Sequence, residues 1–140
     1  MRAISIRAPW WWYILYANKR VENRGRGFPR YTGPVLLHAS KWWRNGEVVE
    51  TWDDVRAEGL LDGVPAASVK GWTWRRLRGA GGHIVGTADI VAVRPNRGEM
   101  AWEAPDQLGL VLDNVKPLDN PVPWRGALGL FEVPWPQEAV

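Results

Sequence analysis

The fold and the candidate site both depend on residues 17–24, which read Ala17-Asn18-Lys19-Arg20-Val21-Glu22-Asn23-Arg24. The stretch follows an apolar segment and precedes a glycine-rich loop, so it is expected to join a helix to a short strand. If residues 21–24 are extended, Glu22 and Arg24 point to the same side, because successive side chains of a strand alternate. Lys19 then reaches over from the end of the helix. The stretch therefore predicts two cations and one carboxylate around a common cleft.

This trio of charges suits a nucleotide ligand. Lysine and arginine bind phosphates and base edges, and a carboxylate accepts hydrogen bonds from a base amino group or a ribose hydroxyl. The spacing alone leaves an alternative open, in which the three side chains only form a solvated salt-bridge network.

Around this stretch the sequence predicts mainly strands. Residues 2–7 alternate like a half-buried strand, and Pro9 then predicts a helix that runs to about Asn18. That helix is apolar on every face, so it is either deeply packed or presents an aromatic patch to a partner. Further strands are expected at 21–24, 35–40, 83–94, 108–112 and 127–133, and further helices at 48–61 and 66–77. This spacing predicts an α+β fold built on a small closed or half-closed β-barrel.

The same stretch carries a resemblance to a known family. The pattern Ala17-x-Lys19-x-x-Glu22-x-Arg24 resembles the G-x-K-x-x-E-x-R signature of the ASCH domain family, part of the PUA-like superfamily, with alanine in place of the glycine. Residues 5–10, Ser-Ile-Arg-Ala-Pro-Trp, are similar to the family's first strand, with alanine where glutamine is common. Segments 33–41, 84–91 and 125–131 are similar to its later core strands. The resemblance spans nearly the whole chain, so residues 1–140 are expected to form a single ASCH domain.

The resemblance implies a PUA-like β-barrel of about six strands flanked by two or three helices, with Lys19, Glu22 and Arg24 lining its cleft. Members of the family are associated with RNA binding, with ribonuclease activity and with amide hydrolysis of acylated cytidine. The expected ligand is therefore single-stranded RNA or a nucleoside, including a modified one. The amidohydrolase reaction requires a hydroxyl nucleophile, and in the acylcytidine hydrolases the residue corresponding to Glu22 is a threonine. Because this chain has a carboxylate there, amidohydrolase activity is only the alternative.

If the chain is an enzyme, it is expected to be a hydrolase. Lys19, with its pKa lowered by Arg20 and Arg24, would deprotonate an attacking water or hydroxyl group while Glu22 positions it. No cofactor is expected, apart from a divalent metal if the protein is a nuclease. The two histidines, His38 and His83, are far apart and have no carboxylate at ligand spacing, which argues against a preformed metal site.

Further residues are expected to contact a nucleic acid. Arginines fall in two clusters, at 20–30 and 75–78, and guanidinium groups suit phosphates and base stacking. Eleven tryptophans are present, some beside basic residues as in grooves that bind single strands, although core packing is the alternative for each. The expected nucleic-acid-binding residues are Trp10, as an aromatic wall, and Arg20, Arg26, Ser40, Lys41, Arg75 and Arg76.

Composition narrows the class of protein further. The absence of cysteine excludes disulfides, thiolate metal sites and a cysteine nucleophile, and it fits a reducing cytoplasm. A net charge of +3 is too modest for indiscriminate binding to nucleic acid. Neither a signal peptide nor a membrane span is predicted. The contrasting hypothesis is a protein-interaction module, or a homodimer, that uses an exposed patch of Trp11, Trp12 and Tyr16.

Overall fold

The computed structural model describes residues 1–41, 71–72 and 74–135. Along the chain these residues form β1 (Arg2–Ile6), α1 (Trp10–Tyr16), β2 (Val21–Arg24), β3 (Gly33–Ala39), α4 (Trp74–Gly79), β4 (His83–Pro95), β5 (Leu108–Pro123) and β6 (Leu130–Glu132). The helix predicted at 48–61 lies outside the described residues. Only the end of the helix predicted at 66–77 is described, and there α4 continues to Gly79.

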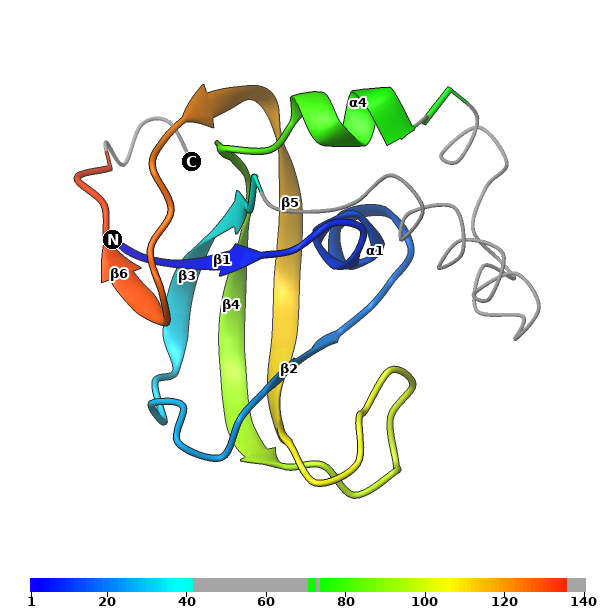
Figure 1. The fold of residues 1–140 in the computed structure, drawn as a ribbon. Coiled ribbons are helices and arrows are strands. Elements are labelled where there is room, and N and C mark those ends of the chain that lie inside the picture. Colours follow the sequence, from blue (N-terminus) through cyan, green and yellow to red (C-terminus); the bar gives the residue numbers. More distant parts are fainter. Residues whose placement is uncertain (42–70, 73, 136–140) are drawn as a thin grey trace.

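The six strands form one sheet in the order β2-β5-β4-β3-β1-β6. Neighbouring strands are antiparallel except for β1 and β3, which run parallel. The sheet curls into a half-barrel with β2 and β6 at its two edges, and two short helices accompany it in the described part of the chain (Figure 1). The prediction of an α+β fold with a small barrel-like sheet is confirmed at this level.

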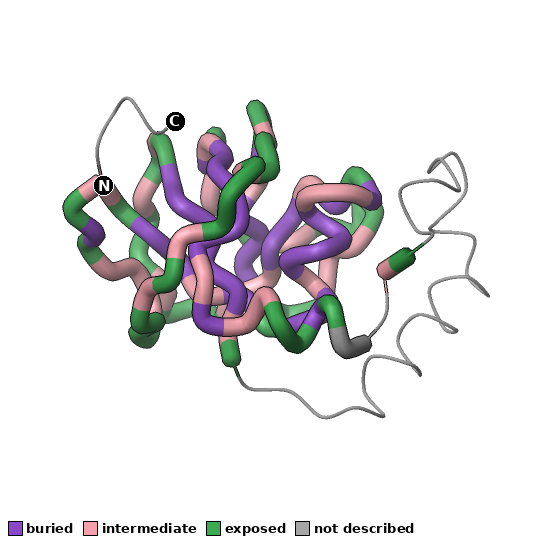
Figure 2. Tube along the Cα trace, turned by 90° about the horizontal axis from the view of Figure 1, so that it is seen from above, coloured by how far each residue is buried: buried purple, intermediate pink, exposed green. Residues whose placement is uncertain are grey.

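The central strands are buried on both faces. In β1, Ile4 belongs to the larger core cluster, which contains α1, whereas Ala3 belongs to a smaller cluster. In β3, Leu37 belongs to the larger cluster and Leu36 to the smaller one. A strand covered on both sides must be apolar at consecutive positions, which explains the unbroken run at 35–39. Buried positions follow these strands and α1 through the interior (Figure 2).

The aromatic residues of α1 lie inside the larger core cluster. Trp11 and Trp12 are buried, and both contact the ring of Trp72 edge-on. Tyr16, which is partly exposed, also packs against Trp72. Deep packing is therefore the correct alternative for this helix. The expected surface patch of Trp11, Trp12 and Tyr16 is not formed, because the two indoles fill the core.

β5 extends beyond its predicted end at residue 112. Asn114, with φ of 50°, adopts the left-handed conformation and lies at an irregularity in the pairing with β4. Such an extra residue bends a strand without ending it. Residues 113–123 have β4 as a partner but no pairing with β2, which begins opposite Val111. This half of β5 is an edge, where the prolines at 117, 121 and 123 are tolerated.

The last strand is shorter than the predicted 127–133, because only Leu130–Glu132 pairs with β1. Gly129, with φ of 64°, belongs instead to the loop that precedes β6. None of the helices in the described ranges has the length and apolar character needed to cross a bilayer.

Candidate ligand-binding cleft

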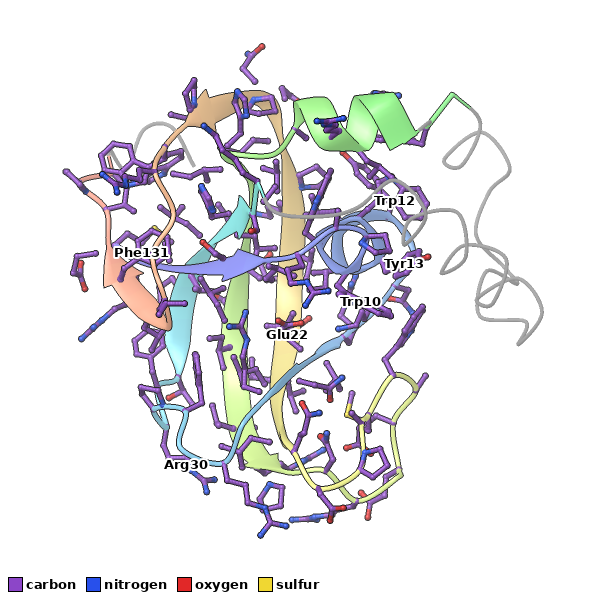
Figure 3. The ribbon with its side chains drawn as sticks, in the orientation of Figure 1. Trp10, Trp12, Tyr13, Glu22, Arg30 and Phe131 are labelled. Carbon is purple, nitrogen blue, oxygen red and sulfur yellow. The ribbon has the colours of Figure 1, made fainter. Side chains whose placement is uncertain are left out.

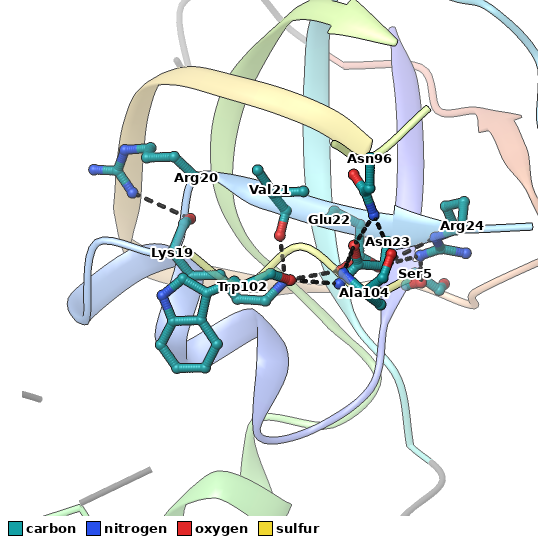
Figure 4. A network of polar contacts seen from close by, with 10 residues as sticks. All are labelled: Ser5, Lys19, Arg20, Val21, Glu22, Asn23, Arg24, Asn96, Trp102 and Ala104. Carbon is teal, nitrogen blue, oxygen red and sulfur yellow. Dashed lines mark hydrogen bonds and ion pairs between the residues drawn. The ribbon is translucent and has the colours of Figure 1, made fainter. Parts of the chain in front are cut away.

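The end of α1 and strand β2 bring Lys19, Glu22 and Arg24 together (Figure 4). Lys19 Nζ donates to the carbonyl of Val21 and lies 3.4 Å from Oε1 of Glu22. Arg24 donates to Oε2 of Glu22 through Nε at 3.1 Å and through one terminal nitrogen at 2.9 Å. The predicted convergence of the three side chains is confirmed.

The turn after α1 depends on Asn18. Its φ of 58° reverses the chain, and the N–H of Lys19 then donates to the carbonyl of Tyr13 at 3.0 Å. Asparagine adopts this left-handed conformation more readily than most residues. Ala17 has φ of −120°, which any residue tolerates. Alanine therefore fits where the ASCH signature has glycine.

Burial sets the electrostatics of the trio. Lys19 is 2% exposed and Glu22 is 8% exposed, so the pair is not the solvated surface network considered above. Burial lowers the pKa of Lys19, Glu22 opposes this, and Arg24 lowers the pKa further. The sequence predicted the direction but assigned it to Arg20 and Arg24. The guanidinium of Arg20 instead donates to the carbonyls of Ile14 and Lys19.

The trio lines an open cleft whose walls come from distant parts of the chain. One wall follows β1 into α1, another is the loop between β4 and β5, and a third is the loop before β6. The lining includes Ser5, Arg7, Trp10, Trp102, Glu103 and Leu128.

Two tryptophans form an aromatic wall of this cleft. Trp10, which was predicted, meets Trp102 edge-on with ring centroids 6.3 Å apart. Trp102 also stacks on Tyr13 of α1 at 5.1 Å, and Figure 3 shows Trp10 and Tyr13 on the helix beside Glu22 of β2. The sequence analysis missed Trp102, because it lies in an irregular loop and its only signal is the general excess of tryptophan.

Trp102 is held in place by the amide of Asn23. The φ of Trp102 is 76°, a conformation that costs a non-glycine residue free energy. Asn23 Nδ2 donates to the Trp102 carbonyl at 2.8 Å, while its Oδ1 accepts from Asn96 at 2.8 Å and from the N–H of Ala104 at 3.0 Å (Figure 4). One side chain inside the signature thus anchors the loop that carries the aromatic wall.

We expect Asn23→Ala to loosen this loop. The change leaves the Trp102 carbonyl and the Ala104 N–H without their partner, and each such loss costs about 1–3 kcal/mol where the group stays buried. Amide hydrogen exchange should accelerate across residues 96–107 and remain unchanged in β3. Asn120→Ala, which removes an exposed amide from β5, is the matched control. Equal exchange in wild type and Asn23→Ala would mean that the amide does not anchor the loop.

A second chamber adjoins the cleft. The two share Ser5, Ser40, Ala127 and Leu128, and the second chamber adds His38, Lys41 and Arg125 among its lining residues. Ser40 and Lys41, both predicted to bind nucleic acid, therefore lie along one continuous groove with the trio.

Three of the other predicted binding residues lie elsewhere. Arg20, Arg26 and Arg76 line neither chamber. The side chain of Arg26 is 77% exposed and lies 3.7 Å from a carboxylate oxygen of Asp106. Arg76 extends over the ring of Trp72 at 3.8 Å. Arg75 belongs to α4, but its side chain lies outside the described residues.

Among the described residues, no group of three or more histidine, cysteine or acidic side chains could hold a metal ion. A comparison of the sequence with protein-family profiles and with curated proteins finds no match. The resemblance to ASCH domains therefore rests on the residues quoted for it above.

Proposed function

We propose that this chain is an RNA- or nucleoside-binding protein of the ASCH type, with a PUA-like fold and a ligand site at Lys19, Glu22 and Arg24. The observation that carries the proposal is a buried lysine and its buried carboxylate in a cleft with an aromatic wall. Burying a charge costs several kcal/mol for each ion in real proteins, which is comparable to the net free energy of unfolding of a whole domain. Buried charged groups that carry such a cost cluster at functional sites more than at purely structural positions.

The trio has hydrogen-bond donors to spare. An ammonium group has three N–H bonds, and Lys19 uses two of them, on Val21 and Glu22. Arg24 uses Nε and one terminal nitrogen on Glu22 and on the Ser5 carbonyl, which leaves its other terminal nitrogen for a ligand. With one positive charge in excess, the trio suits phosphate oxygens and base carbonyl groups.

The aromatic wall suits a base. A nucleobase stacks on an indole whatever its identity, and each stacked base contributes about 1–3 kcal/mol. Trp10 and Trp102 are both partly exposed in the cleft. A single-stranded RNA or a free nucleoside presents such a base, whereas a duplex hides it.

A hydrolase acting on RNA is the enzymatic form of this proposal. The lowered pKa of Lys19 favours it, because an uncharged amine can take a proton from a water or a ribose hydroxyl. The acylcytidine amidohydrolase reading is weaker, since it calls for a hydroxyl at the position of Glu22. A divalent metal for the nuclease reaction and a cytoplasmic location are further parts of this proposal.

Binding of a labelled hexaribonucleotide, followed by fluorescence anisotropy, tests the site. Arg24→Lys keeps the charge beside Glu22 but removes the spare guanidinium donors, so affinity should fall about tenfold, the equivalent of one charged hydrogen bond. Arg76→Lys is the matched control, because that arginine also covers an aromatic ring but lies outside the groove. Wild-type affinity should also weaken as salt rises. If Arg76→Lys impaired binding and Arg24→Lys did not, the site would lie on α4.

A further inference from the structure

Ser5 and His38 form a hydrogen-bonded pair that the trio does not use. They lie opposite one another in the parallel pairing of β1 and β3. Ser5 Oγ is 2.8 Å from Nδ1 of His38, and Nε2 of the same ring is 2.7 Å from the carbonyl oxygen of Trp124. The ring is therefore held at both nitrogens.

These contacts fix where the protons lie. A carbonyl oxygen only accepts, so Nε2 of His38 carries a proton and donates it to Trp124. In a neutral imidazole Nδ1 is then the basic nitrogen, and the hydroxyl of Ser5 donates to it. Burial lowers the pKa of His38, which keeps the ring in this neutral form. Ser5 thus faces a base that is correctly oriented to remove its proton.

The pair is accessible from the groove on the serine side. Ser5 is partly exposed and lines both the cleft and the second chamber, whereas His38 is 2% exposed. Gly126 packs closely against the pair, since a Cβ there would lie 2.6 Å from Ser5 Oγ and 3.0 Å from His38 Nδ1. A small ligand therefore approaches the oxygen from the two chambers that Ser5 lines, and not past Gly126.

We propose that Ser5 is a nucleophile activated by His38, and that this chain hydrolyses small carboxylic esters at the junction of the two chambers. The activity is separate from RNA or nucleoside binding and does not depend on it. Its three parts are a hydroxyl, an imidazole that accepts its proton, and a backbone carbonyl that orients the imidazole, in the place that a carboxylate takes in a Ser-His-Asp triad.

The chemistry balances without a cofactor. Ser5 Oγ forms a bond to the acyl carbon while its proton moves to His38 Nδ1, and that proton then leaves with the alcohol as the ester C–O bond breaks. Water attacks the acyl-serine in the same way, giving its proton to His38 and releasing the carboxylic acid as Ser5 regains its hydrogen. Backbone N–H groups of residues 125–128, which make no backbone hydrogen bond within the described chain, lie in the adjoining loop, where they could stabilise the oxyanion.

Hydrolysis of 4-nitrophenyl acetate and labelling by a fluorophosphonate test this proposal. Wild-type protein should take up one phosphonate, and peptide mass spectrometry should locate it on Ser5. Ser5→Ala should lose both the label and the hydrolysis. His38→Asn keeps an acceptor for the serine hydroxyl but cannot take its proton, so kcat/KM should fall about 100-fold or more, the usual contribution of a general base.

Two further variants complete the test. Gly126→Ala places a methyl group 2.6 Å from Ser5 Oγ, so the side chains of the pair or the loop must shift, and labelling should be lost. Tyr31→Phe removes a hydroxyl outside the groove and should leave labelling unchanged. Folded wild-type protein that is neither labelled nor active, or a Ser5→Ala variant as active as wild type, would show that the pair only holds β1 to β3. Neither result would bear on RNA binding, which the anisotropy measurement reports.

Discussion

Lys19→Met should weaken the binding of RNA and nucleosides roughly 10- to 100-fold without unfolding the protein. Methionine keeps an unbranched apolar stem of similar length but removes the charge, so the ligand loses a donor that contributes about 1.5–3 kcal/mol, or roughly 10- to 100-fold in affinity. Stability should change little, because the substitution also removes the cost of keeping a charge at a site that is 2% exposed. Anisotropy titration measures the first effect and urea unfolding the second.

Lys116→Met provides the control for this prediction, since it removes a lysine from the exposed half of β5, outside both chambers. It should bind RNA as wild type does. Retained affinity in Lys19→Met would remove the lysine from the binding site.

Glu22→Gln should destabilise the protein strongly. The amide keeps the shape of the carboxylate but leaves the charges of Lys19 and Arg24 without their partner, and breaking a buried pair in this way costs about 3–5 kcal/mol. Part of the loss should be relieved by deprotonation of Lys19, whose pKa burial already lowers. The midpoint of urea unfolding should therefore fall markedly.

Glu132→Gln is the matched comparison for Glu22→Gln. Glu132 also pairs with an arginine, Arg2 at 2.9 Å, but its side chain is 64% exposed. A surface pair contributes only about 0–1 kcal/mol, so its loss should barely move the unfolding midpoint. Similar small effects of the two substitutions would mean that water reaches Glu22 far more freely than its burial indicates.

Local patterns predicted much of this architecture. Alternation in residues 2–7 and the apolar run at 35–40 identified β1 and β3, and the spacing of charges in residues 17–24 placed the trio correctly. These features succeed because strand periodicity fixes the direction of side chains within a few residues. The predicted end of the strand at residue 112 failed because Asn114 bends β5 at a bulge, and the pairing that sustains it comes from β4.

The contacts that complete the site were beyond local reasoning. Trp102 meets Trp10 because Asn23 holds the loop that carries Trp102. Asn23 is 79 residues from Trp102 and 81 residues from Ala104 along the chain. Burial of Lys19 depends on α1, β2 and the loops around them together. Arg76 of α4 lies outside both chambers, which the sequence could not show, because composition shows which charges cluster in the sequence but not where the fold places them.

The indole N–H signals in a ¹⁵N-labelled protein test the central claim most directly, with Trp10→Phe and Trp102→Phe spectra used to assign the two peaks. On titration with a short single-stranded RNA, the Trp10 and Trp102 signals should move together and reach saturation at one bound RNA. The signal of Trp135, which packs against the smaller core cluster, should not move. A saturating shift confined to Trp72, beneath Arg76, or no shift in any indole, would contradict a ligand site at Lys19, Glu22 and Arg24.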